Sequence, residues 1–304
     1  MDEICRTIDC DYLEPEFAAA FLRISGAEAA FIEANTTFAV PKLLQALAAE
    51  GRSPTDVRWI VITHVHLDHA GGAGALAAAC PNATVLCHPA AGRHLRDPSK
   101  LIASARDVYG PEKFAALYGD ISPIPADRVR ELADGESVEF GGSSLRVHHT
   151  RGHAKHHFVV DDEAADVVFT GDTFGLAYPL LQRAGTFAFP STSPAGFEAE
   201  EARKSIDLVL GLGRKTACLT HYGAFQDLEG IAAQLRPWID LSERLLEVAR
   251  QKGPSSLAEI RETLRERMQE CAAARGLQLG ERDWTALALD LDLNAQGLVA
   301  VGAR

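Results

Sequence analysis

The sequence predicts an α/β fold in which mixed strands and helices are followed by a helical C-terminal extension. Short apolar runs of strand length alternate with helix-like segments as far as residue 224. After that point, residues 225–250 and 255–275 have helical periodicity and many charges, and Gly253-Pro254 separates them. We therefore expect an α/β domain over residues 1–224 and a helical extension over residues 225–304.

The first half of the expected α/β domain begins with two strands around a Ser25-Gly26 turn. The mostly apolar run from Val57 to Thr63 is typical of a buried strand. A helix after Pro41 is expected to stop at Gly51. The expected strands are residues 18–24, 29–33, 57–63 and 83–87, and the expected helices are residues 41–50, 74–80 and a region over 90–117 that is broken at Pro98 and Pro111.

The second half of the domain is expected to contain mainly strands. Gly141-Gly142 separates two of them and predicts a tight turn. The expected strands are residues 137–140, 144–150, 158–161, 166–170 and 216–219, and one helix is expected over residues 197–210.

Composition and charge limit the classes of function. The chain has 304 residues, of which 47% are hydrophobic, enough for a sizeable core, and its formal net charge of -12 disfavours nucleic-acid partners. No run approaches the about 20 apolar residues of a membrane span, so no membrane partner is expected. The six cysteines form no CxxC pair and are expected to be free thiols. The polar, acidic first residues do not resemble a secretory signal, so a cytoplasmic location is expected.

A histidine cluster follows the predicted strand over residues 57–63. It reads Thr63-His64-Val65-His66-Leu67-Asp68-His69. Side chains two residues apart in an extended chain point the same way, so His64 and His66 can reach one metal ion. Asp68 and His69 follow where the chain turns toward a helix, and they can face a second ion. This spacing predicts a metal site.

Three more residues of ligand type follow predicted strands. They are His153 in Thr150-Arg151-Gly152-His153, Asp172 in Thr170-Gly171-Asp172-Thr173, and His221 in Leu219-Thr220-His221. Ligands at the same ends of several strands converge on one edge of a sheet, where rigid strand ends hold their geometry. On spacing alone, His148, His149, His156 or His157 could replace His153, but the Thr-x-Gly-His context favours His153.

Together these residues resemble the metallo-β-lactamase superfamily, from the first strands to His221. The resemblance implies an αββα sandwich with the metals at one edge. It also implies the ligand sets, which are His64, His66 and His153 for one ion, Asp68, His69 and His221 for the second, and Asp172 as the bridge between them.

The residues around the ligands are similar to those of the glyoxalase II-like and lactonase-like branch. Asp172 stands where class B1 β-lactamases have a cysteine, and a helical extension also fits that branch. Glu33-Ala34-Asn35-Thr36 replaces the usual Asp-Thr-Gly, with Glu33 as the candidate for the role of that aspartate. Arg151 replaces the usual proline before Gly152, and no Arg-x-x-Lys in the C-terminal segment supports glutathione recognition.

The implied activity is hydrolysis of a thioester, ester or lactone by a metal-bound hydroxide. Two divalent ions are expected, zinc first, with iron or manganese also compatible. Asp68 is expected to orient the water, Asp172 to bridge the ions, and Tyr222 either to donate to the oxyanion or to pack on the core. The expected partner is a small-molecule acyl substrate, and the C-terminal helices are expected to cap the site, form a homodimer face or be simply solvated.

Three other classes of function remain open from the sequence. An iron-dependent oxidoreductase of the persulfide dioxygenase type would keep a single iron, and the presence of Asp68, His69 and His221 argues against it. A nuclease or phosphodiesterase of the same fold is disfavoured by the net charge. A regulatory protein that binds metals without turnover is the third.

Overall fold

The computed structural model describes residues 3–192 and 196–304. The chain forms two compact units, and each is described by itself. Unit 1 consists of Met1–His149, His156–Gly171 and Arg214–Ala224, and unit 2 consists of Thr150–Lys155, Asp172–Gly213 and Phe225–Arg304. Thus the segments 150–155 and 172–213, which lie before the boundary predicted at residue 224, belong to the same unit as the C-terminal helices.

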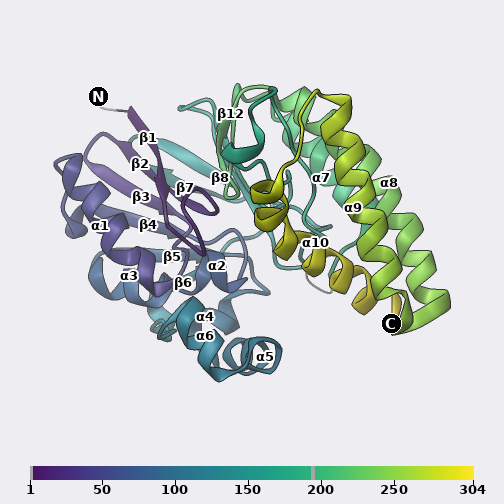
Figure 1. The fold of residues 1–304 in the computed structure, drawn as a ribbon. Coiled ribbons are helices and arrows are strands. Elements are labelled where there is room, and N and C mark those ends of the chain that lie inside the picture. The colour runs from purple at the N-terminus through teal and green to yellow at the C-terminus, as the bar shows by residue number, and fades with distance from the viewer. Residues whose placement is uncertain (1–2, 193–195) are drawn as a thin grey trace. The chain divides into compact units, whose positions relative to one another are not determined.

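The first sheet has six strands whose order in space equals their order in the chain (Figure 1). The first three are antiparallel neighbours, and the last four are parallel to one another. The strands are β1 (Glu3–Asp9), β2 (Ala19–Ser25), β3 (Glu28–Ile32), β4 (Val57–Val61), β5 (Thr84–Cys87) and β6 (Val129–Glu131). The strands predicted over residues 18–87 are confirmed, whereas β1 and β6 were not predicted.

The second sheet has six strands in the order β12-β11-β10-β9-β8-β7. Its pairs from β7 to β10 are antiparallel, and β10 runs parallel to β11. The strands are β7 (Ser137–Phe140), β8 (Ser143–His149), β9 (Phe158–Asp162), β10 (Val167–Gly171), β11 (Thr216–Leu219) and β12 (Gly223–Phe225). The five strands predicted in this region are confirmed, and β12 is additional.

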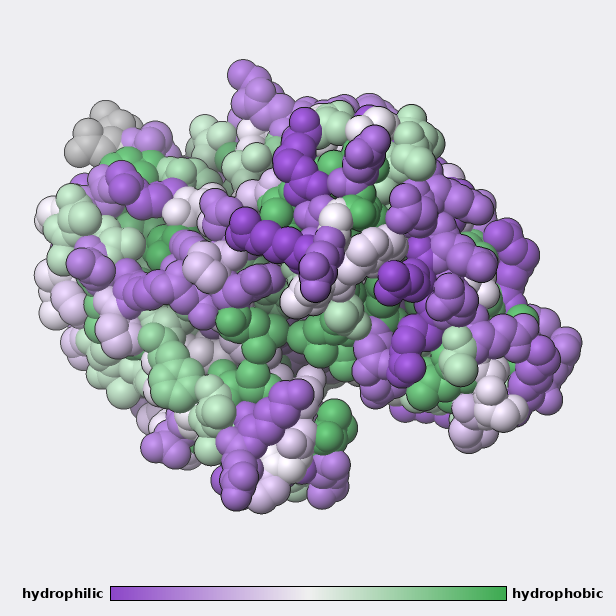
Figure 2. Space-filling view, viewed as in Figure 1, coloured by the Kyte–Doolittle hydropathy of each residue, from purple (hydrophilic) through white to green (hydrophobic). Residues whose placement is uncertain are grey.

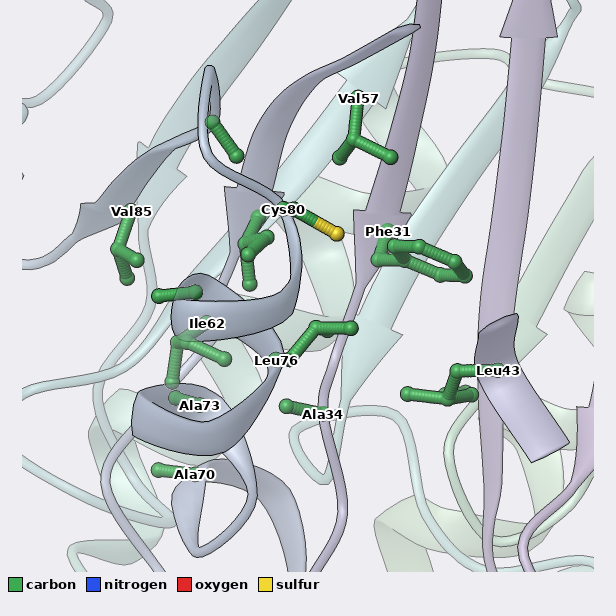
Figure 3. Packing of buried hydrophobic residues seen from close by; sticks show 14 of the residues in the cluster. Phe31, Ala34, Leu43, Val57, Ile62, Ala70, Ala73, Leu76, Cys80 and Val85 are labelled. Atoms are coloured by element: carbon green, nitrogen blue, oxygen red, sulfur yellow. The ribbon is translucent and has the colours of Figure 1, made fainter. Parts of the chain in front are cut away.

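Alternate residues of the strands of the first sheet face two different hydrophobic layers. Leu22 of β2 and Phe31 of β3 face the layer under α1 (Val40–Ala49) and α3 (Ala73–Ala79), which Figure 3 shows. Phe21 of β2 faces the opposite way, into the layer between the two sheets, where its ring lies 5.3 Å from that of Phe169 of β10. Because side chains alternate along a strand, burial on both faces requires the continuous apolar runs seen in the sequence.

Four further helices of unit 1 follow the first sheet's strands in the chain. They are α2 (Leu67–Ala70), α4 (Gly92–Arg96), α5 (Ser99–Tyr109) and α6 (Pro111–Tyr118). The breaks predicted at Pro98 and Pro111 are confirmed, because α5 begins directly after Pro98 and α6 begins at Pro111. Proline suits a helix start because its missing N–H would have no partner there.

Unit 2 is built around α7 (Ala199–Gly211), α8 (Leu228–Lys252), α9 (Leu257–Ala274) and α10 (Glu281–Gly302). The Asp227 carboxylate caps α8 by accepting from the Gly230 N–H at 3.0 Å. The three long helices bury apolar stripes that include Trp238, Leu264 and Leu298. Hydrophilic residues cover most of the surface where α8 and α9 lie in Figure 2.

The predicted fold class is confirmed. Two mixed sheets pack face to face, helices flank them, and long helices over residues 228–302 form the C-terminal part of the chain. In the part of the chain that the structure describes, no helix combines the length and apolar character needed to cross a membrane.

Candidate metal centre

The first two candidate ligands lie just beyond the carboxyl end of β4. The Ile62 N–H continues the sheet by donating to the Leu86 carbonyl at 3.0 Å, and the chain then leaves the sheet. His64 is fully buried, and its Nε2 lies 2.7 Å from Nδ1 of the half-buried His66. The two rings therefore point one nitrogen each toward a common position, as the spacing of two residues predicts.

The second group of candidate ligands is Asp68, His69 and His221, whose ligand atoms all lie within 4.8 Å of one another. Asp68 and His69 belong to the single turn of α2, and His221 follows β11. The Asp68 Oδ2 atom lies 3.5 Å from His221 Nε2 and 3.9 Å from His69 Nε2. Two ligands of one tetrahedral zinc ion lie about 3.4 Å apart, given metal–ligand distances of about 2.0–2.1 Å. The spacing thus fits a shared ion.

Hydrogen bonds at the opposite ring nitrogens orient these histidines. His221 Nδ1 lies 2.8 Å from the Phe17 carbonyl oxygen, and His69 Nδ1 lies 3.1 Å from Glu33 Oε1. A carbonyl can only accept, so His221 Nδ1 carries the proton and Nε2 presents its lone pair toward Asp68. This arrangement is the one that metal-bound histidines use.

Glu33 anchors the histidine motif from the end of β3. Its side chain is fully buried, its backbone has φ +68°, and its Oε1 accepts from the Thr63 hydroxyl as well as from His69. Asn35 in the same loop donates from Nδ2 to the Asp68 carbonyl at 2.9 Å. Glu33 therefore holds the His69 ring, and its equivalence to the family's aspartate stays a prediction.

Replacing Glu33 by glutamine is expected to weaken metal binding about 10- to 100-fold, because the anchor of His69 loses its charge. Competition with a zinc-binding dye measures this affinity directly. Glu50→Gln, at an ion pair with Arg6, is the matched control and should bind zinc like the unmodified protein. Equal zinc affinity in Glu33→Gln would show that Glu33 does not support the ligands.

His153 and Asp172 lie together in unit 2. His153 Nε2 is 3.5 Å from Asp172 Oδ2, both side chains are buried, and His153 Nδ1 lies 3.4 Å from the Ser191 carbonyl. His153 therefore repeats the arrangement of His69 and His221, with one nitrogen toward an oxygen acceptor and the other toward a carboxylate. Gly152 has φ +109°, and a Cβ there would overlap the backbone of Ala202 in α7, so only glycine fits before His153.

Comparison with known proteins decides the family. The model of the metallo-beta-lactamase superfamily matches residues 25–221, more than half of the chain. The chain belongs to the metallo-beta-lactamase superfamily. The match begins at β2 and ends at His221, so it contains every candidate ligand.

Individual relatives agree with this assignment. The metallo-beta-lactamase fold-containing protein ST1585 of Sulfurisphaera tokodaii is 34% identical over 121 residues, which are 38% of this chain and 44% of that protein. A hydroxyacylglutathione hydrolase of Rhodopseudomonas palustris is 32% identical over 148 residues, 46% of this chain and 45% of that enzyme. The matched regions thus span less than half the length of either relative.

A solved structure supports the fold over nearly the whole chain. The archaeal metallo-beta-lactamase superfamily protein ST1585 from Sulfolobus tokodaii superposes with a TM-score of 0.67 at 22% identity. The superposition covers 98% of this chain and 99% of that one. It therefore extends to the long C-terminal helices.

Four other histidines lie close to His153 in the sequence, and their surroundings differ from those of the candidate metal ligands. Among the described residues, none of them belongs to a group of candidate ligand atoms. His149 Nε2 lies 3.0 Å from the Leu132 carbonyl, and His156 Nδ1 lies 3.5 Å from the Val65 N–H. His157 is buried with its ring centroid 5.0 Å from that of His64, and His148 is half-buried.

Tyr222 packs against the hydrophobic layer between the two sheets. Burial, with the nearby Asp9 and Glu16 carboxylates, raises the pKa of Tyr222 to about 12, so the phenol is protonated at neutral pH. Its contacts are those of the packing alternative, and its part in binding an oxyanion stays a prediction.

Sequence reasoning missed the oxygen atoms that orient the histidines. The carbonyls of Phe17 and Ser191 accept from His221 and His153, but a backbone carbonyl leaves no signature in the side chains. Asn35 gave a weak signal for an unusual backbone in this loop. Asparagine is enriched among non-glycine residues with positive φ, and Asn35 has φ +50°.

Proposed function

We propose that the protein is a dinuclear metal-dependent hydrolase that cleaves a thioester, ester or lactone. In this proposal His64, His66 and His153 would hold one ion, Asp68, His69 and His221 would hold the second, and Asp172 would be a ligand shared by both. The observation that carries the proposal is the shared orientation of His69, His153 and His221, each with Nδ1 toward an oxygen acceptor and Nε2 toward a carboxylate.

The covalent connections of the chain support a common site for the two ligand sets. Inside unit 1, the end of β10 lies against the start of the histidine motif, since a Cβ on Gly171 would overlap the Thr63 hydroxyl and the His157 ring. Asp172 follows Gly171 directly, and His64 follows Thr63 directly. Consecutive Cα atoms are only about 3.8 Å apart, so this connectivity supports a common site for His64 and Asp172.

The ions and the side chains around them would have different roles in the reaction. Bound there, the ions would supply Lewis-acid activation of a water and of the substrate carbonyl. Asp68 has the side chain best placed to orient that water, because it is 25% exposed while His69 and His221 are buried. The carboxylate can also hold a proton at Oδ and pass it to the leaving group.

Zinc is the proposed metal, with iron or manganese as alternatives, because imidazole and carboxylate ligands suit all three. We expect about two ions per chain by elemental analysis of protein purified without chelator. Chelation should abolish hydrolysis, and zinc should restore it. A stoichiometry of one iron per chain together with oxygen consumption on a persulfide substrate would instead support the dioxygenase alternative.

A panel of three acyl compounds tests the reaction class. S-lactoylglutathione, an acyl-CoA and an acyl-homoserine lactone are offered to protein loaded with zinc, manganese or iron. The relative that is named a hydroxyacylglutathione hydrolase supports a thioester as the first expectation. Cleavage of the lactone alone would move the protein to lactonases, and cleavage of a phosphodiester with no acyl cleavage would overturn the proposal.

A further inference from the structure

A single peptide group in unit 2 links His153 to the C-terminal helix α10. The Ser191 carbonyl, which accepts from His153 Nδ1 at 3.4 Å, and the Thr192 N–H belong to the same peptide bond. That N–H donates to the side-chain Oδ1 of Asn294 at 2.7 Å. Because a trans peptide group is planar, its carbonyl and its N–H point in opposite directions. Asn294 therefore holds, from one side, the group that orients His153 from the other.

Two more hydrogen bonds join Asn294 to the residues around Ser191. Its Nδ2 donates to the Pro190 carbonyl at 3.1 Å, and its backbone carbonyl accepts from the Thr192 hydroxyl at 3.2 Å. A carboxamide has one acceptor oxygen and two N–H donors, so it can bind the peptide groups before and after Ser191 at once. One side chain thereby fixes both peptide planes that flank Ser191.

The position of Asn294 in α10 is unusual for a polar side chain. Leu287, Leu291 and Leu298 are buried at helical spacing on this helix, and Asn294 lies among them with 6% exposure. A polar side chain in an apolar stripe costs stability unless hydrogen bonds satisfy it, whereas a leucine would simply continue the stripe. The contacts of its amide therefore explain why an asparagine stands here.

A second contact ties α10 to the segment that contains Ser191. Arg183 donates from Nη1 and Nη2 to the two carboxylate oxygens of Asp283, in the first turn of α10, at 2.9 and 2.7 Å. This ion pair docks the helix without touching the peptide group that orients His153. Docking of the helix and orientation of His153 thus involve different residues and can be tested separately.

We propose that Asn294 is a positioning residue for the candidate metal ligand His153. It acts through the Ser191–Thr192 peptide group, whose carbonyl keeps the His153 proton on Nδ1. The lone pair of Nε2 then faces Asp172 Oδ2, 3.5 Å away. Hydrogen bonds in such a chain polarise one another, which makes the carbonyl a stronger acceptor. This inference rests on the proposed function, since His153 is a metal ligand only in that proposal.

The inference gives the C-terminal helix a part in one half of the metal centre. His153 belongs to only one of the two proposed ligand sets, so a change at Asn294 should weaken one ion and leave the other nearly unaffected. Glu33 contacts His69, which belongs to the other set. Changes at Glu33 and at Asn294 are therefore expected to affect different ions.

Asn294→Leu tests the inference by removing the donor and the acceptor while keeping a side chain of similar size. Competition with a zinc-binding dye should show the dissociation constant of one ion raised about tenfold, the lower end of the effect of losing a hydrogen bond that supports a ligand. Arg183→Gln, which breaks the ion pair with Asp283, is the matched control and should bind zinc like the unmodified protein. Equal weakening in the two variants would mean that α10 only docks the segment, and would overturn the inference.

Asn294→Asp separates the orientation of the peptide group from the stability of the fold. A carboxylate still accepts from the Thr192 N–H but cannot donate to the Pro190 carbonyl, so both Asn294 variants should lower the urea midpoint. Asn294→Asp should nevertheless keep most of the zinc affinity that Asn294→Leu loses. If zinc affinity follows the urea midpoint in both variants, the role of Asn294 is structural and the inference fails.

Nitrogen-15 NMR of the histidine rings in metal-free protein gives a readout that needs neither turnover nor metal. At a pH at which its ring is neutral, we expect His153, identified by comparison with His153→Gln, to carry its proton on Nδ1. Asn294→Leu should show a mixture of the two tautomers. An unchanged Nδ1–H signal in Asn294→Leu would contradict the positioning role.

The two proposals can fail separately. If the unmodified protein binds no metal and cleaves no acyl compound, the hydrolase proposal fails, and a His153 tautomer that depends on Asn294 still supports the positioning of this ring. If metal binding and acyl hydrolysis are found and Asn294→Leu changes neither the zinc affinity nor the tautomer, the hydrolase proposal stands and the positioning role is excluded.

Discussion

Replacing Asp172 by asparagine should lower kcat/KM for the best acyl substrate about a thousandfold or more, equivalent to about 4 kcal/mol of lost transition-state stabilisation. The amide keeps the size of the carboxylate but has no negative charge. A neutral amide oxygen cannot bridge two cations as a carboxylate does. Because Asp172 is only 6% exposed, solvent cannot replace the missing charge.

The metal content of this variant separates a lost bridge from a general loss of structure. Asp172→Asn should bind fewer than two ions per chain while keeping the circular dichroism spectrum of the unmodified protein. Asp207→Asn is the matched control, since Asp207 lies in the same unit and pairs with Arg236 at the surface. Two tightly bound ions and undiminished hydrolysis in Asp172→Asn would exclude the bridging role.

The candidate ligands that could be named from the sequence are those that follow a strand. His64, Asp172 and His221 each follow a buried strand, β4, β10 and β11, whose apolar runs are easy to recognise. Strand ends are rigid, so the ligand types after them could be placed without knowing the rest of the fold. The histidine motif needed only the alternation of an extended chain.

The parts that escaped prediction depend on contacts between distant segments. β1 mixes exposed and partly buried residues and contains Arg6 and Asp9, so it lacks the apolar run of a central strand. β6 has only three residues. Tyr12 and Tyr118 meet across 106 residues of sequence, and nothing local to either tyrosine signals the pairing. Only the folded chain shows these features.

The role of Arg23 was also not predicted from the sequence. Arg23→Met is expected to destabilise unit 1 by about 3–5 kcal/mol. Arg23 lies in β2 with 1% exposure, and its Nε donates to Asp162 Oδ2 in β9 at 2.6 Å. The pair therefore connects the two sheets. Methionine fills similar space but leaves the buried Asp162 carboxylate without its cation.

Chemical unfolding in urea measures this loss if the signal reports on unit 1. The chain has three tryptophans, and Trp59 lies in the layer between the sheets, whereas Trp238 and Trp284 belong to unit 2. Fluorescence of Trp59 in a background with Trp238→Phe and Trp284→Phe therefore follows unit 1. Arg23→Met in that background should lower the urea midpoint with little change in slope.

The double variant Arg23→Met with Asp162→Asn distinguishes a lost charge pair from lost packing. Removing the carboxylate removes the uncompensated buried charge, so the double variant should recover much of the stability lost by Arg23→Met. If the double variant is as unstable as Arg23→Met, packing of the arginine against the Phe140 ring, 5.9 Å from the guanidinium, carries the effect instead. In that case the two sheets are joined mainly by their apolar layer, and the ion pair adds no net stability.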